Sequence, residues 1–194
     1  VSGTYQVGGA VGYSSYSTAA PSLNQVTVNG NVTGTSNTLG GAYVGGMVGK
    51  SDSTALLTAT SLTHSGTVTS TGDYTGGLFG SLAGGLNLSN SSHSGTVTGK
   101  SATGGLAGSV AGNTTLSNVS NSGNVTGTTQ TGGLVGLSSG TFNLTNTPGT
   151  AMSGSVSGTT SVGGLVGNLL GNSTLTGGTT PLVTGNVTGT QYVG

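Results

Sequence analysis

The sequence predicts an all-β protein that folds as one parallel β-solenoid (β-helix) over residues 1–194. Two segments recur in step along the chain: a glycine-rich pentad and, later in each repeat, a short segment centred on Val. The residues between them are mostly Gly, Ser, Thr, Asn and Val, which disfavour helices and suit strands and turns. The spacing predicts about six coils of 28–37 residues, each with three short strands. One coil cannot bury its apolar face alone, whereas stacked coils bury it continuously.

Each coil begins near a pentad of two glycines, two mostly bulky residues and a third glycine. The pentads start at Gly8, Gly45, Gly76, Gly104, Gly132 and Gly163. We expect the glycines at tight corners with positive φ, and at places where backbones approach closely. The first bulky position predicts a core ladder of Leu78, Leu106, Leu134 and Leu165, continued less regularly by Met47 and Ala10.

The second segment of each repeat is a polar stretch that carries Leu. Its leucines predict another inward column one coil apart, because equivalent residues of stacked coils lie on top of one another. The members of this predicted column are Leu57, Leu88, Leu116, Leu144 and Leu175.

The third segment is a short strand in which Val alternates with polar residues. A period of two places Val inside and its polar neighbours outside. The predicted inner column consists of Val32, Val68, Val97, Val125, Val156 and Val187. In two coils the outward neighbours are threonines, which gives a candidate surface array of Thr67, Thr69, Thr96 and Thr98.

Two stretches carry a family resemblance, SGNVTGTTQTGGLVG at residues 122–136 and SGSVSGTTSVGGLVG at residues 153–167. They resemble GLUG-motif repeats, and the resemblance extends over nearly the whole chain in six copies. It implies a stalk or passenger module of a large bacterial surface or secreted protein of the adhesin-like kind, and no catalytic domain. This chain departs from the common pattern in having few charges and in lacking the Cys-Tyr pair.

Composition narrows the function classes. The chain has a net charge of zero and no Cys, and its charged side chains are Lys50, Asp52, Asp73 and Lys100. Without a basic run, nucleic acid is a poor partner, and no apolar run is long enough for membrane insertion as a spanning helix. Because the chain starts at Val1 without Met, we expect it to be processed or part of something larger.

Catalysis is not expected, and no cofactor is implied. The two carboxylates, Asp52 and Asp73, lie at different phases of their repeats, and the chain has no Arg or Glu. Glycoside chemistry on β-helices needs paired carboxylates. We therefore predict no catalytic residues. Asp73 and Lys100 lie about one coil apart and are expected to form an exposed ion pair.

His64 and His93 lie 29 residues apart, which is one coil, so stacking places them about 5 Å apart. Two interpretations are open. They form part of a transition-metal site, or they share a solvent-facing column that continues with Asn121. No third ligand is visible in the sequence, which favours the second interpretation and predicts no metal.

The two ends of the chain read alike, VSGTYQVG at residues 1–8 and VTGTQYVG at residues 187–194, and neither has a polar cap. Uncapped solenoid ends invite further pairing. We therefore expect end-to-end self-association into a fibre, or continuation of a longer solenoid.

The resulting expectation is a non-catalytic structural or adhesive protein, secreted or at the cell surface, with surface glycans or other cells as further partners. One alternative is ice binding through the outward Thr-x-Thr face. A second, less favoured alternative is a carbohydrate-active β-helix enzyme.

Overall fold

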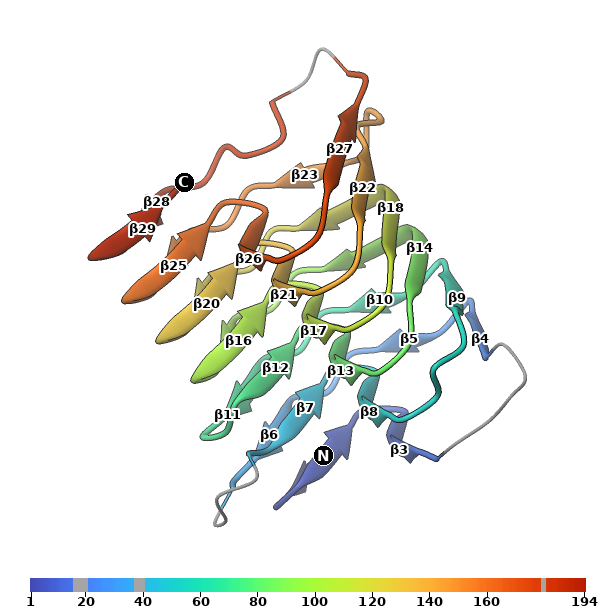
Figure 1. The fold of residues 1–194 in the computed structure, drawn as a ribbon. Helices are drawn as coiled ribbons and strands as arrows, with labels where there is room; N and C mark the ends of the chain where they lie inside the picture. The colour runs from blue at the N-terminus through green and yellow to red at the C-terminus, as the bar shows by residue number, and fades with distance from the viewer. Residues whose placement is uncertain (16–20, 37–40, 179–180) are drawn as a thin grey trace.

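The computed structural model describes residues 1–15, 21–36, 41–178 and 181–194. Within these ranges the chain is all-β, and its parallel strands stack as a β-solenoid of about six turns (Figure 1). This confirms the predicted fold class. None of the described residues belongs to a helix that could cross a membrane.

The strands form four sheets, here called sheets A, B, C and D, and each turn of the chain visits them in that order (Figure 1). The prediction of three strands per coil is wrong because the pentad is not one strand. Its first glycine ends a strand of sheet B and its second bulky residue begins a strand of sheet C, as at Gly76 and Phe79.

Sheets A and B have seven strands each. Sheet A consists of β1 (Ser2–Gly3), β6 (Val32–Gly34), β11 (Val68–Ser70), β15 (Val97–Thr98), β19 (Val125–Thr126), β24 (Val156–Ser157) and β28 (Val187–Thr188). Sheet B consists of β2 (Gln6–Gly8), β7 (Tyr43–Gly45), β12 (Tyr74–Gly76), β16 (Ser101–Gly104), β20 (Thr129–Gly132), β25 (Thr160–Gly163) and β29 (Gln191–Val193).

Sheet C has six strands and sheet D has nine. Sheet C consists of β3 (Val11–Ser14), β8 (Val48–Ser51), β13 (Phe79–Leu82), β17 (Ala107–Val110), β21 (Val135–Ser138) and β26 (Val166–Leu169). Sheet D consists of β4 (Ser22–Asn24), β5 (Thr27–Val28), β9 (Leu57–Thr60), β10 (Thr63–His64), β14 (Leu86–His93), β18 (Thr114–Asn121), β22 (Phe142–Thr145), β23 (Ala151–Met152) and β27 (Ser173–Thr176).

The valine ladder has the predicted register. Val68 pairs with Val32 on one side and Val97 on the other, and the series continues through Val125 and Val156. The members up to Val156 are fully buried, and Val187 at the end of the ladder is partly buried. Parallel pairing in register therefore turns one Val per coil into a continuous apolar column.

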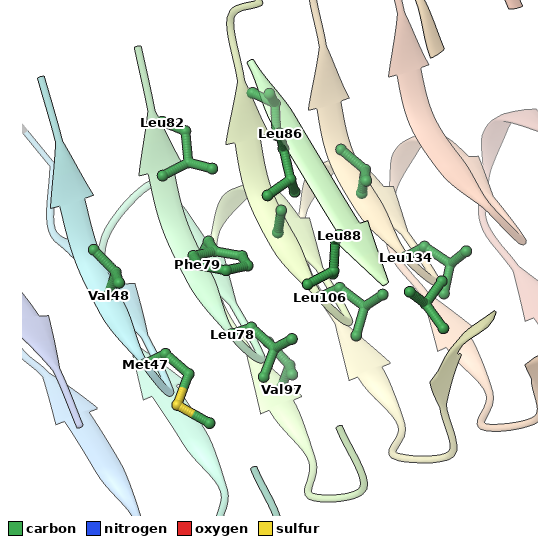
Figure 2. Packing of buried hydrophobic residues seen from close by; sticks show 14 of the residues in the cluster. Met47, Val48, Leu78, Phe79, Leu82, Leu86, Leu88, Val97, Leu106 and Leu134 are labelled. Atoms are coloured by element: carbon green, nitrogen blue, oxygen red, sulfur yellow. The ribbon is translucent and has the colours of Figure 1, made fainter. Parts of the chain in front are cut away.

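The pentad leucines also stack as predicted. The amide of Leu78 donates to the carbonyl of Leu106 at 2.8 Å, and that of Leu106 to Leu134 at 2.8 Å. All three are fully buried, as is Met47, and Figure 2 shows these side chains in the interior between the sheets. At the two ends of the ladder, Leu165 is partly buried and Ala10 is exposed.

The third predicted column is wrong at one position. Leu57 pairs with Leu86, and the residue aligned with Leu88 is Ala59. Both Leu57 and Ala59 point inward, because the start of sheet D contributes two inward residues per coil. The column through Leu88 continues to Leu116, Leu144 and Leu175 as expected, and Leu175 at its end is exposed.

The pentad glycines serve close packing, and the prediction that they have positive φ is wrong. A Cβ on Gly76 would lie 2.0 Å from the carbonyl oxygen of Phe79, and the other first glycines of the pentads are equally confined. Among the described residues, left-handed backbone occurs mainly at non-glycine residues in two rows. One row follows sheet D and consists of Gln25 and Ser61, which lie between strands of that sheet, and of Asn90 and Asn118 within β14 and β18. The other row, in sheet B, consists of Ala102, Gln130, Ser161 and Tyr192.

Candidate functional site

The predicted threonine array lies on the outer surface of sheet A. Thr67, Thr69 and Thr96 are exposed and Thr98 is half-buried, and Thr69 pairs directly with Thr98. The array is longer than the four predicted residues. The column that follows the buried valines carries a hydroxyl in every coil, through Thr33, Thr69, Thr98, Thr126, Ser157 and Thr188.

The column that precedes the buried valines is less regular, and its asparagines bind the backbone. The Oδ1 atom of Asn31 accepts the amide N–H of Thr67 at 2.9 Å, and that of Asn124 accepts the amide of Ser155 at 2.9 Å. These side chains join one coil to the next. Asparagine at this position therefore contributes hydrogen bonds between coils, where threonine contributes a surface hydroxyl.

Sheet D carries a similar outward column, so hydroxyl and amide groups are not confined to sheet A. Thr58 pairs with Asn87, and the series continues through Thr115 and Asn143 to Thr174. Two faces of the solenoid therefore present regular, uncharged polar ladders to solvent.

His64 and His93 stack as predicted, on adjacent strands β10 and β14. Their ring centroids are 5.1 Å apart and their planes differ by 18°. The prediction of a solvent-facing column is wrong, because His64, His93 and Asn121 are all buried, with 0–1% of their surfaces exposed. Val28 precedes them in the same inward column and Met152 follows them.

A slip in the alternation of sheet D turns His93 inward. In β14, Leu86 and Leu88 point inward, but Ser89 and Asn90 both face outward because Asn90 has a left-handed φ of 49°. Beyond this bend Ser91 and His93 are buried. A strict period of two from Leu86 would have left His93 outside, so the bend decides the position of the ring.

The second glycine of each pentad makes room for this column. A Cβ on Gly46 would lie 2.3 Å from Nδ1 of His64, and one on Gly77 would lie 2.5 Å from Cγ of His93. Likewise, a Cβ on Gly105 would lie 2.3 Å from the amide nitrogen of Asn121. Burial lowers the pKa of His93 to about 4, against the opposing hydrogen bond to Asn121.

This arrangement does not suit a metal ion held between the two rings. Imidazole lone pairs lie in the ring planes, so nearly parallel stacked rings do not aim them at one point between the rings. Across the part of the chain that the structure describes, no three His, Cys, Asp or Glu side chains lie close enough to share a metal.

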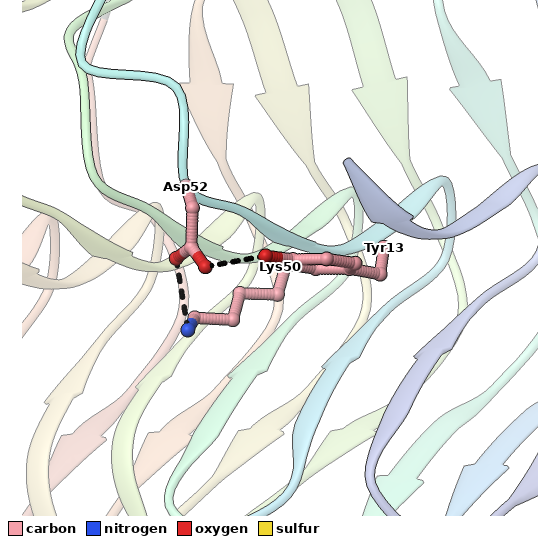
Figure 3. A network of polar contacts seen from close by, with 3 residues as sticks. All are labelled: Tyr13, Lys50 and Asp52. Carbon is pink, nitrogen blue, oxygen red and sulfur yellow. Dashed lines mark hydrogen bonds and ion pairs between the residues drawn. The ribbon is translucent and has the colours of Figure 1, made fainter. Parts of the chain in front are cut away.

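Sequence reasoning missed a cluster of polar and aromatic side chains on the first three coils. The hydroxyl of Tyr13 donates to Oδ2 of Asp52 at 2.8 Å, and Nζ of Lys50 lies 2.8 Å from Oδ1 of the same carboxylate (Figure 3). Lys50 also lies over the ring of Tyr43, which stacks on Tyr74 with centroids 4.9 Å apart. The common phase of Tyr43 and Tyr74, 31 residues apart, was the available signal.

The charged and polar groups of this cluster shift one another's pKa values. Hydrogen bonds from Lys50 and then Tyr13 lower the pKa of Asp52, and the bond to Asp52 raises the pKa of Lys50 and of Tyr13. Both carboxylate oxygens of Asp52 are thus engaged. Among the described residues, Lys50 and Asp52 form an ion pair, and the predicted pair between Asp73 and Lys100 is not formed.

Comparison with protein-family models, with curated proteins and with solved structures finds no match to this chain. The resemblance to GLUG-motif repeats therefore stays a prediction that depends on the two quoted stretches.

Proposed function

We propose that this chain is a non-catalytic structural module of a secreted or cell-surface protein, whose function is to supply length and stiffness. It would form the stalk of an adhesin or a head-to-tail subunit of an extracellular fibre. One observation carries the proposal: four parallel sheets run in register through all the coils without a break in the described residues. Each coil adds about 4.8 Å of length.

The direction of the hydrogen bonds supports a mechanical role. In a solenoid the ladder bonds run along the long axis, so an axial load between two coils is shared by four sheets and by the buried columns. Asn31 and Asn124 add side-chain bonds between coils. With few charges on the chain, repulsion between stacked modules is small.

The last described coil offers a surface for further stacking. A hollow there is lined by Gly164, Leu165, Val166, Val183, Val187 and Gly194. Leu175 and Val193 are also exposed, on strands β27 and β29 at the edges of their sheets. Further coils of the same pattern, or a second copy, would cover this apolar surface and pair these edges.

Electron microscopy and fibre diffraction of the native material test this proposal. We expect elongated particles in the micrographs and a diffraction reflection at about 4.8 Å along the long axis. Dispersed particles without elongation, under conditions where the fold is intact by circular dichroism, would contradict it. The adhesive form also needs a partner, and binding to an array of surface glycans would identify one.

Ice binding is the second candidate, favoured by the hydroxyl column from Thr33 to Thr188. The hydroxyl residues repeat once per coil in register along sheet A, and this regular spacing supports the candidate. Thermal hysteresis measures this activity. We expect Thr98→Tyr on sheet A to abolish it and Thr115→Tyr on sheet D to leave it unchanged. Absence of hysteresis in the parent chain would end this candidate.

A further inference from the structure

The two histidines of the chain are both inside the solenoid, where nothing in the structural role proposed above requires them. Their column also contains Asn121, and it begins with Val28 and continues to Met152, so apolar side chains fit the same position at both ends of the column. Two stacked, titratable rings in the middle coils are therefore a feature that packing alone does not explain.

The partners of His93 determine which nitrogen of its neutral ring carries the proton. The amide nitrogen of Asn121 donates to the carbonyls of Gly123 and Gly133, at 2.9 and 3.2 Å, so its Oδ1 faces His93 as an acceptor. Nδ1 of His93, 3.1 Å away, must then carry the proton. Nε2 of the same ring lies 3.3 Å from another acceptor, the carbonyl of Gly66. A neutral ring satisfies one of these acceptors and a protonated ring would satisfy both, so the two contacts favour protonation. Burial of the ring, which is 1% exposed, opposes protonation more strongly and is the largest influence on the pKa of His93.

His64 has a simpler environment. Its Nε2 lies 3.1 Å from the carbonyl of Gly30 and donates to it, and its Nδ1 has no hydrogen-bond partner within the described part of the chain. An imidazole carries no negative charge in either form, so His64 offers no counter-charge to His93, on which it is stacked, and its Coulombic influence lowers the pKa of His93.

Within the described ranges, no other charge faces the pair. Strand β5 contributes Val28, strand β18 contributes Asn121, and the pentads opposite contribute glycines such as Gly46 and Gly77. Lys50 and Asp52 pair with each other on the outer surface. Asp73 and Lys100 are solvent-accessible residues that do not contribute to the titration of His93.

We propose that His93, stacked on His64, is an acid-sensitive joint of the solenoid, which takes up a proton on acidification and opens the coils around β10, β14 and β18. The joint is independent of whether the solenoid serves as a stalk, a fibre or an ice-binding surface. It makes the middle coils stable at neutral pH and labile in acid.

The sign of the effect follows from burial. His93 has a pKa of about 4 when folded, against an ordinary value of 6.5, so the opened chain binds the proton more tightly. Its contribution to stability is complete above about pH 6.5 and declines as the pH falls towards 4. Between pH 7.5 and 5.0 these values raise the opening equilibrium constant by about 25-fold.

Hydrogen exchange at pH 7.5 and 5.0, corrected for the intrinsic pH dependence, tests the joint. In the parent chain we expect protection in β10, β14 and β18 to fall by about 25-fold, with a smaller loss in β24 and β25. His93→Met, which repeats the side chain of Met152 in the same column, should remove most of the difference. His64→Val, which repeats that of Val28, should retain most of it because His93 is still present.

An equal pH effect in the parent and in His93→Met would overturn the proposal, and so would a loss of protection spread evenly over all coils. If His93→Met does not fold, the imidazole signals of the parent chain decide. A ring of His93 that stays neutral down to about pH 5 supports the joint. Protonation of that ring near pH 6.5 in the intact fold contradicts it.

Discussion

Thr103 lies one coil from Thr75 in sheet B, directly paired with it, and both hydroxyls are buried without a hydrogen-bond partner among the described residues. Thr131 extends the series in the same way. The column begins and ends with valines, including Val44 and Val162. Threonine and valine have nearly the same shape, so either residue fits this inward column. Where the residue is threonine, its buried hydroxyl has no hydrogen-bond partner among the described residues.

Replacing Thr103 by Val should therefore stabilise the protein. The change removes a buried hydroxyl that has lost its bonds to water, and we expect a gain of about 1 kcal/mol in the free energy of unfolding. Urea denaturation measures it. Thr69→Val, on the exposed face of the neighbouring sheet A, is the matched control and should change stability by less than about 0.5 kcal/mol. Equal effects at the two positions would show that burial of the hydroxyl is not the cause.

The pentad glycines should not tolerate a methyl group. A Cβ on Gly105 would lie 2.1 Å from the carbonyl oxygen of Gly133 and 2.3 Å from the side chain of Asn121. We expect Gly105→Ala to cost about 3 kcal/mol or more, since backbone of the next coil must move. Thermal unfolding with circular dichroism measures the loss.

Gly30 provides the comparison for this prediction. No atom lies within 4 Å of a Cβ placed on it, and its φ is not in the left-handed region. Gly30→Ala should be neutral, or stabilising by a few tenths of a kcal/mol through the unfolded chain. Similar losses at Gly30 and Gly105 would contradict the close-packing explanation of the pentads.

The spacing of repeats determines much of this fold in advance. Once Gly76 is aligned with Gly104, the register of the valine and pentad-leucine ladders follows, because parallel strands pair residue by residue. Two features of sheet D cannot be predicted by aligning the repeats. The left-handed Asn90 shifts the alternation of β14 by one residue and buries His93. Two inward columns also lie so close in sheet D that the repeat pattern places Leu57 in the wrong one.

The surface cluster of Tyr13, Lys50, Asp52 and Tyr43 could not be predicted from the sequence for a different reason. Lys50 and Asp52 are close in sequence, but their contacts with Tyr13 and Tyr43 depend on how long side chains of adjacent coils lie across one another. Periodicity fixes backbone register and the inward or outward direction of a residue. It does not fix the rotamers of exposed side chains.

Asn124 should stabilise the stack through its side chain. Its Oδ1 accepts the amide of Ser155, 31 residues later, so Asn124→Ala leaves that N–H to water. We expect a loss of about 1 kcal/mol in the free energy of unfolding. Asn186 has the same position in the last described coil, and no described residue binds its side chain. Asn186→Ala should therefore have little effect, and a loss as large as that of Asn124→Ala would refute the bridging role.

Asp52 should control the ionisation of Tyr13. The hydrogen bond from Tyr13 to Asp52 is the main cause that raises the pKa of this phenol, and the negative charge of Asp52 acts in the same direction. In Asp52→Asn the charge is gone, so Tyr13 should ionise at a lower pH than in the parent chain. Ultraviolet absorbance or NMR titration of the tyrosines in the alkaline range measures the shift. Asp73→Asn, which removes a carboxylate with no part in the titration of Tyr13, should leave the curve unchanged.

The ion pair of this cluster lies at the surface, where Lys50 and Asp52 are only partly buried. Its contribution to folding is therefore small, and Asp52→Asn should alter stability by less than about 1 kcal/mol. A large loss of stability with an unchanged tyrosine titration would mean that Asp52 holds the first coils together by contacts other than those with Tyr13 and Lys50.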